Sequence, residues 1–257
     1  MLDFAVEILE EAGTVALRYF RSDLDISNKA GGGAFDPVTE ADRAIERQLR
    51  DRIQARYPGH GLLGEEFGRS AGEEPLEWII DPIDGTRAFV SGLPTWGMLL
   101  GLSENGRPRL GAMHQPFLGE TFAGEGNRAT LHDRHGTHVL RARNQVSIEE
   151  AIVCSTDPDM FAGAAEHAAF ARVEQRCRLR RYGTDCYAYC MLAAGIVDAV
   201  VETLLQPYDI VPLIPIIEGA GGVVSDWEGG SAADGGRIVA AATGSLHEQI
   251  LSLLAGP

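Results

Sequence analysis

The chain has 257 residues, of which 45% are hydrophobic and 23% charged, so it can bury a large core without support from a disulfide or a metal ion. Its formal net charge of −15 would repel nucleic-acid phosphates and an anionic membrane surface, which argues against either as a partner. The acidic first residues lack a secretory pattern and the apolar run at 186–197 is too short to span a bilayer, so we expect a cytoplasmic protein.

The first predicted elements are two helices. Apolar residues at helical spacing predict an amphipathic helix over 2–19. A glycine-rich loop at 23–35 separates it from a second helix, which begins at about Thr39 and ends before Pro58-Gly59. Each helix carries one apolar face.

A sheet is predicted next. The apolar run Trp78-Ile79-Ile80 predicts a strand with Asp81 at its C-terminal end, where open sheets commonly bind ligands. Turn signals interrupt the apolar runs between 95 and 123, which indicates an antiparallel meander. The polar residues at 124–147 predict a surface excursion.

The second half of the chain alternates between strands and helices. The predicted order is a strand near Ile152, a helix over 162–170, a strand near Leu179, a helix over 186–194, a strand over 197–202, a helix over 209–220, a strand over 223–226, and a last strand and helix over 238–254. No linker long enough to separate independent domains interrupts the sequence. Residues 1–257 therefore predict one domain with two lobes, about 1–147 and 148–257, sharing one cleft.

The densest chemical signal is Asp81-Pro82-Ile83-Asp84-Gly85-Thr86, directly after the predicted strand. Pro82 stiffens the turn and Gly85 allows a sharp bend, so Asp81, Asp84 and the carbonyl of Ile83 can converge on one point. Hard oxygen ligands of this kind suit Mg²⁺ or Mn²⁺ rather than zinc. The same residues also fit an ordinary turn, so other parts of the sequence are needed to distinguish a metal site from a turn.

Three further blocks favour a metal site: Asp36 to Asp42, Gly64-Glu65-Glu66, and Tyr208-Asp209 continuing to Gly222. In this order and spacing, the four blocks closely resemble the inositol-monophosphatase superfamily of metal-dependent sugar and small-molecule phosphatases, over nearly the whole chain. The resemblance implies an α+β fold in α-β-α-β-α layers, with two lobes around one metal-binding cleft, and a homodimer.

The resemblance also implies roles for individual residues. Two or three Mg²⁺ ions, or Mn²⁺, would be held by the carboxylates and one carbonyl of Glu65, Asp81, Ile83, Asp84 and Asp209. Asp42 and Thr86, with Glu65 as a third catalytic residue, would steer the attacking water in an in-line displacement without a covalent phosphoenzyme. Backbone amides of Gly85 and Thr86 would hold the phosphate, and Asp84 and Asp209 would also contact the substrate.

Several of these residues have a second interpretation as helix caps. Thr39 and Asp42 also fit a capping box, which is as good an explanation of Asp42 as catalysis. Asp209 could cap the helix that it begins, and Asp185 could cap the helix expected from Cys186.

The substrate prediction depends on three stretches, 86–97, 181–190 and 207–219, which resemble histidinol-phosphate phosphatases. Asp185 and Glu202 would face the alcohol part of the substrate. Two carboxylates there suit a cationic leaving group such as histidinol, which carries an ammonium and an imidazole.

The predicted function is therefore hydrolysis of L-histidinol phosphate to L-histidinol in histidine biosynthesis. An inositol-1-phosphate or broad-specificity sugar-phosphate phosphatase is the nearest alternative, since it would need the same metals but neutral recognition of hydroxyls. A catalytically silent regulator that binds metal or phosphate is the alternative from another class. The intact acidic residues and Thr86 argue against it.

Overall fold

The computed structural model of the chain describes residues 1–22, 27–28, 37–38 and 40–256. Most of the predicted glycine-rich loop at 23–35, and the capping residue Thr39, lie outside this part of the chain. Two short strands, β1 (Ser27–Asn28) and β2 (Pro37–Val38), pair antiparallel to each other.

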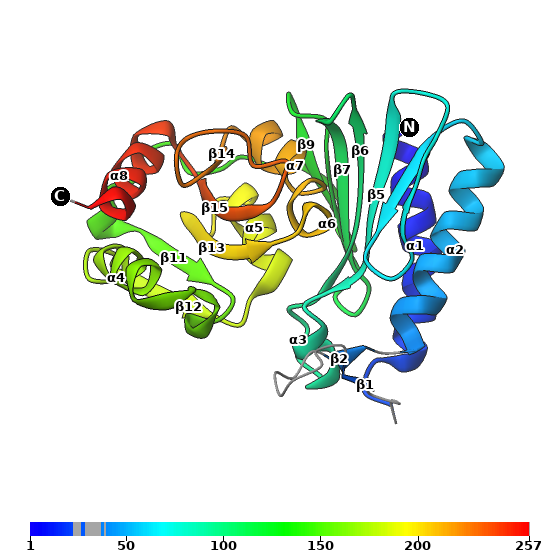
Figure 1. Cartoon of the computed structure of the whole chain (residues 1–257), viewed down its shortest axis with the longest axis horizontal. Helices are drawn as coiled ribbons and strands as arrows, with labels where there is room; N and C mark the ends of the chain where they lie inside the picture. The colour runs from blue at the N-terminus through cyan, green and yellow to red at the C-terminus, as the bar shows by residue number, and fades with distance from the viewer. Residues whose placement is uncertain (23–26, 29–36, 39, 257) are drawn as a thin grey trace.

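Two helices form the outer layer on one side of the molecule (Figure 1). They are α1 (Leu2–Tyr19) and α2 (Glu40–Arg56), both where apolar spacing predicts them. The buried face of α1 repeats every three or four residues, as an amphipathic helix requires: Ala5, Ile8, Leu9, Ala12 and Ala16. The two helices contact each other and cover the first sheet.

The first sheet has eight strands in the order β10-β9-β8-β7-β6-β5-β3-β4. Their bounds are β3 (Gly61–Gly64), β4 (Gly68–Ser70), β5 (Leu76–Asp84), β6 (Gly97–Glu104), β7 (Arg107–Gln115), β8 (Glu120–Gly124), β9 (Ala129–Asp133) and β10 (Gly136–Val139). The antiparallel meander over β6 to β8 confirms the prediction. The predicted surface excursion at 124–147 does lie mostly at the surface, but it contains β9 and β10, which extend the sheet. Little of either strand is buried, and both are short and largely polar, so neither carries an apolar signal in the sequence.

A layer of short helices lies between the two sheets (Figure 1). It contains α5 (Asp185–Ala193), α6 (Pro207–Ile210) and α7 (Ile214–Gly219). The single helix predicted over 209–220 is wrong: Pro212 lies in the turn that separates α6 from α7, since proline lacks the N–H that a continuous helix needs. Gly111 lets this turn pack directly on the first sheet, because an added Cβ there would lie 1.7 Å from the Pro212 carbonyl oxygen.

The second sheet has five strands in the order β12-β11-β13-β15-β14. They are β11 (Ile152–Ser155), β12 (Leu179–Tyr182), β13 (Ala199–Leu205), β14 (Val223–Asp226) and β15 (Gly236–Ala241). Helices α4 (Gly163–Glu174) and α8 (Gly244–Ala255) pack together on its outer side (Figure 1). The result is the mixed α+β fold in α-β-α-β-α layers that the sequence resemblance implies.

The hydrophobic core between the two sheets draws on both halves of the chain. Met113 and Phe122 of the first sheet belong to the same buried cluster as Leu213, Val200 and Ile238. The strands of the first sheet end at Val139 and those of the second begin at Ile152, on either side of the predicted lobe boundary. The division into lobes at residue 147 itself stays a prediction.

Two further features of the described residues are the state of the cysteines and the apolarity of the helices. The four cysteines, all in the described part of the chain, are free thiols. Among the described residues, no helix is both long and apolar enough to cross a membrane.

Candidate active site

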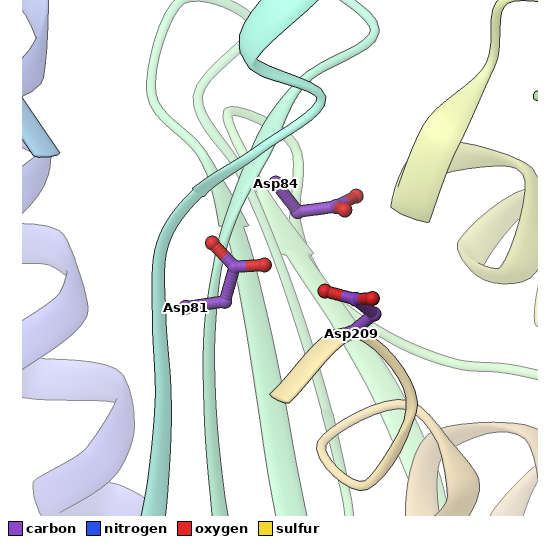
Figure 2. Close-up of side chains that lie close together, drawn as sticks. All are labelled: Asp81, Asp84 and Asp209. Atoms are coloured by element: carbon purple, nitrogen blue, oxygen red, sulfur yellow. The ribbon is translucent and has the colours of Figure 1, made fainter. Parts of the chain in front are cut away.

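Three carboxylates meet between the first sheet and the central helices. One oxygen each from Asp81, Asp84 and Asp209 lies within 4.8 Å of the others. Figure 2 shows Asp81 and Asp84 projecting from the end of β5 and Asp209 approaching from α6. The structure thus brings together three of the predicted metal ligands from two distant segments of the sequence.

A bulge in β5 places two of these acids on one side. The pairing of β5 with β6 is regular to Asp81 opposite Leu99, then shifts and resumes with Asp84 opposite Gly97. Side chains three residues apart in a regular strand point to opposite faces, so this shift is what lets both carboxylates converge. Pro82 lies within the bulge, where its missing N–H costs no ladder hydrogen bond.

The next turn fits the prediction that the backbone bends at Gly85. Gly85 has φ 80°, and α3 (Thr86–Val90) begins immediately after it. The Thr86 hydroxyl donates to the carbonyl of Ile83 over 3.1 Å. An added Cβ at Gly85 would lie 3.0 Å from the side chain of Asp185, so glycine is required here for space as well as for backbone conformation.

The electrostatics of the cluster favour a bound cation. Burial raises the pKa of Asp81, and the charges of Glu65, Asp84, Asp209 and Asp42 raise it further. Burial and the charge of Asp84 likewise raise the pKa of Asp209. Among the described residues, no arginine or lysine pairs with any of the three acids, and Oδ1 of Asp81 is buried without a hydrogen bond. A set of hard oxygen donors with uncompensated charge fits Mg²⁺ or Mn²⁺.

The second half of the chain holds Asp84 in place. Its Oδ2 accepts the backbone N–H of Cys186, at the start of α5, over 2.6 Å. Burial still raises the pKa of Asp84, although this hydrogen bond opposes the rise. The alternative that Asp185 caps α5 is wrong, because Thr184 is the N-cap residue and Asp185 is the first helical residue, with φ 42°.

Asp209 has both of the roles considered for its position. It is the third residue of α6, and its Oδ2 accepts the backbone N–H of Gln206 over 2.7 Å in a capping box. Its carboxylate also belongs to the three-acid cluster. The cap therefore fixes the direction from which Asp209 enters the site.

Glu65 and Asp42 lie near the cluster but outside the 4.8 Å group. Asp42 is buried in the first turn of α2, and its charge acts on Asp81. Glu65 follows β3, and the next two amides are fixed by buried Glu46, which accepts the N–H of Glu66 over 2.6 Å and that of Phe67 over 3.3 Å. Sequence reasoning missed this anchoring role of Glu46, whose only signal is a charged residue on the apolar face of α2.

The predicted substrate-binding acids line a small cavity beside the cluster. Its volume is about 80 Å³, and its walls include Asp84, Thr156, Asp185, Tyr189, Glu202 and Asp209. Burial raises the pKa of Glu202 to about 7 and that of Asp185 to about 8, the charge of Asp84 adding to the second. A larger hollow of about 860 Å³ lies beside α4 and α8, far from these acids in the fold.

Glu202 is held by two donors that sequence reasoning missed. It is 2% exposed, Oε1 accepts the backbone N–H of Thr156 over 2.8 Å, and Oε2 accepts the hydroxyl of Tyr189 over 2.8 Å. The Thr156 contact is made by a backbone N–H, which any residue except proline has, so the sequence could not indicate it. Tyr189 lies one helical turn after Asp185, and that spacing could have indicated it.

Comparison with known proteins gives the family. The sequence model of the inositol monophosphatase family matches residues 1–256. The chloroplastic bifunctional phosphatase IMPL2 of Arabidopsis thaliana is 36% identical, over 96% of this chain and 72% of that protein. The histidinol-phosphatase of Chlorobaculum parvum is 32% identical, over 98% of this chain and 96% of that one. An inositol monophosphatase from Zymomonas mobilis has the same fold, with a TM-score of 0.87, 33% identity, and coverage of 99% and 97% of the two chains.

The layered fold, the buried acidic cluster and these similarities define a metal-dependent phosphatase. The chain belongs to the inositol monophosphatase family. This outcome confirms the resemblance carried by the four sequence blocks.

Proposed function

We propose that this phosphatase hydrolyses L-histidinol phosphate to L-histidinol in histidine biosynthesis. The supporting observation is that Asp185 and Glu202 line the same cavity as Asp84 and Asp209. An alcohol leaving from a phosphate held near the cluster would enter an acidic cavity, where an ammonium or imidazolium is favoured over a neutral polyol. The name of the Chlorobaculum parvum relative supports the same substrate.

The metal ions belong to this proposal. Mg²⁺, in two or three copies and replaceable by Mn²⁺, would be held by Asp81, Asp84 and Asp209, with Glu65 and the carbonyl of Ile83 as further ligands. When bound, the ions would supply Lewis-acid charge that offsets the negative charge of the phosphate and of the departing alkoxide.

The remaining residues would orient the attacking water and the ester. The Thr86 hydroxyl already donates a hydrogen bond to the carbonyl oxygen of Ile83. Its own oxygen can therefore only accept a hydrogen bond from the water. The carboxylate of Asp42 or of Glu65 would accept the one proton that the water loses, and the departing alkoxide would take up a proton from solvent to leave as the alcohol. Amides of Gly85 and Thr86, at the start of α3, would donate to the phosphate oxygens while the bond from phosphorus to the alcohol breaks.

An inositol-1-phosphatase is the second candidate, because the Zymomonas mobilis structure shares the fold across nearly the whole chain. It would use the same metal ligands, and the cavity acids would then accept hydrogen bonds from hydroxyl groups. We also propose a cytoplasmic homodimer, which light scattering of the purified protein would test.

Phosphate release from histidinol phosphate and from inositol 1-phosphate, measured side by side with Mg²⁺ and with a chelator, tests the proposal. We expect a higher kcat/KM for histidinol phosphate and loss of both activities on chelation. A preference for inositol 1-phosphate would refute the substrate assignment. Turnover that survives chelation would refute the proposed use of the carboxylate cluster.

A further inference from the structure

The contact between Tyr189 and Glu202 joins two fully buried side chains, each 2% exposed. The Tyr189 hydroxyl donates to Oε2, and the Thr156 amide donates to Oε1 on the other side. A carboxylate offers about four acceptor positions, so positions remain for a further donor. Because both residues line the 80 Å³ cavity, that donor can come from a molecule inside it.

The donors that support Glu202, a phenol and an amide, leave its negative charge uncancelled. An arginine or lysine beside Glu202 would neutralise it, whereas a phenol and an amide stabilise the ionised form without cancelling its charge. Among the described residues, Glu202 has no cationic ion-pair partner. The carboxylate therefore keeps its capacity to attract a positive charge in the cavity.

Helix α5 links this contact to the rest of the site. Its first turn supplies Asp185 to the cavity and the Cys186 amide to Asp84, and Tyr189 follows one turn later. Residues four apart on a helix share a face, so one rigid element orients both the carboxylate cluster and Glu202.

We propose that Tyr189 is a positioning residue for substrate selection: it holds Glu202 in the orientation that binds the cationic part of the leaving alcohol. The inference rests on the proposed function and deepens it, since it assigns the recognition of a positive charge to a Tyr189–Glu202 pair. Tyr189 itself touches no reacting atom in this scheme.

The chain offers a matched control on the same helix. Tyr187 also donates its hydroxyl to a glutamate, Glu120, over 2.6 Å, but neither residue lines the cavity. Tyr187→Phe and Tyr189→Phe therefore remove the same chemical group from the same helix, and only the second removes it from the cavity.

The test compares KM and kcat for histidinol phosphate and for glycerol 2-phosphate, whose alcohol is neutral, in wild type and both variants with saturating Mg²⁺. For Tyr189→Phe we expect KM for histidinol phosphate to rise about tenfold, as for a lost hydrogen bond to a charged group. KM for glycerol 2-phosphate, kcat, and inhibition by inorganic phosphate should stay near wild type. Tyr187→Phe should change none of them.

Equal KM values for histidinol phosphate in the two variants would overturn the inference, as would a similar rise for both substrates in Tyr189→Phe. Glu202→Gln provides a second test: Tyr189→Phe should add no further loss in that background. If Tyr189→Phe does not fold, Glu202→Gln alone provides the test. An unchanged ratio of KM for histidinol phosphate to KM for glycerol 2-phosphate in Glu202→Gln would overturn the role of the pair. The proposed function is judged separately, by whether the wild type prefers histidinol phosphate.

Discussion

Replacing Asp84 with asparagine should have opposite effects on stability with and without metal. The asparagine side chain keeps the shape of aspartate and an oxygen able to accept the Cys186 amide, but it removes one charge from the three-acid cluster. At 4.8 Å and an effective dielectric constant of about 20, two unit charges repel by about 3.5 kcal/mol. Burial raises the pKa of these acids and so favours their protonation, which lessens the repulsion; we therefore expect a smaller relief of about 1–3 kcal/mol.

The relief of repulsion and the loss of metal binding change the melting temperature of the variant in opposite directions. In chelator at pH 8, Asp84→Asn should melt higher than wild type by about 2–12 °C, at about 2–4 °C per kcal/mol for a chain of this size. With Mg²⁺ at about a thousand times its dissociation constant, the wild type gains about 4.1 kcal/mol and the variant much less. The order of melting temperatures should then reverse.

The assay is thermal unfolding followed by circular dichroism, in chelator and in Mg²⁺, together with phosphate release. Turnover of the variant should fall by about a hundredfold to a thousandfold, as expected when a group that stabilises transition-state charge is lost. A variant that melts lower than wild type in chelator would show that the cluster is not under charge repulsion. A folded variant with near-normal activity would refute the role of Asp84 as a metal ligand.

Three further perturbations follow from particular contacts. Asp185→Asn tolerates the left-handed backbone at φ 42° and, at pH 9, above the Asp185 pKa of about 8, removes a negative charge; the ratio of kcat/KM for histidinol phosphate to that for inositol 1-phosphate should then fall about tenfold. Gly111→Ala drives a Cβ into the Pro212 carbonyl and should cost about 3 kcal/mol in urea unfolding, whereas Gly244→Ala, with nothing within 4 Å, should be nearly neutral. Burial lowers the pKa of His114 below 6.5, so the unfolded chain takes up a proton at this position before the folded chain does as the pH falls. The wild type therefore loses stability between pH 7 and pH 5. This loss in the free energy of unfolding, measured in urea, should be smaller in His114→Gln.

Patterns local to the sequence were sufficient for much of the fold and for part of the site. Helical periodicity in α1 and α2 reflects burial of one face of each helix, and the unbroken apolar run of β5 reflects burial on both faces of the sheet, against α2 on one side and α6 on the other. Asp81 and Asp84 were predicted to converge because Pro82 and Gly85 constrain the turn between them. Asp209 is distant in sequence, and its place in the site came from the family resemblance.

The features that were missed depend on contacts between distant segments. Strands β9 and β10 are stabilised by backbone hydrogen bonds to each other and to β8, and these bonds are independent of side-chain polarity. The N-terminus of α5 is satisfied by Asp84 rather than by adjacent Asp185, a choice that only the packing of the two halves determines. The Thr156 amide that supports Glu202 likewise becomes visible only once β13 lies beside β11.

These contacts mean that the acidic site and the packing of the two halves depend on each other. Asp81 and Asp84 come from β5, whereas Asp209 and the Cys186 amide come from the central helices. Bringing these acids together is unfavourable without a cation, so the buried apolar cluster between the sheets has to supply the opposing free energy. A bound metal ion would reverse the sign of the electrostatic term and add to that packing. Metal binding should therefore protect the amide hydrogens of α5 and α6 from exchange more than those of α4 and α8, which pack on the far side of the second sheet.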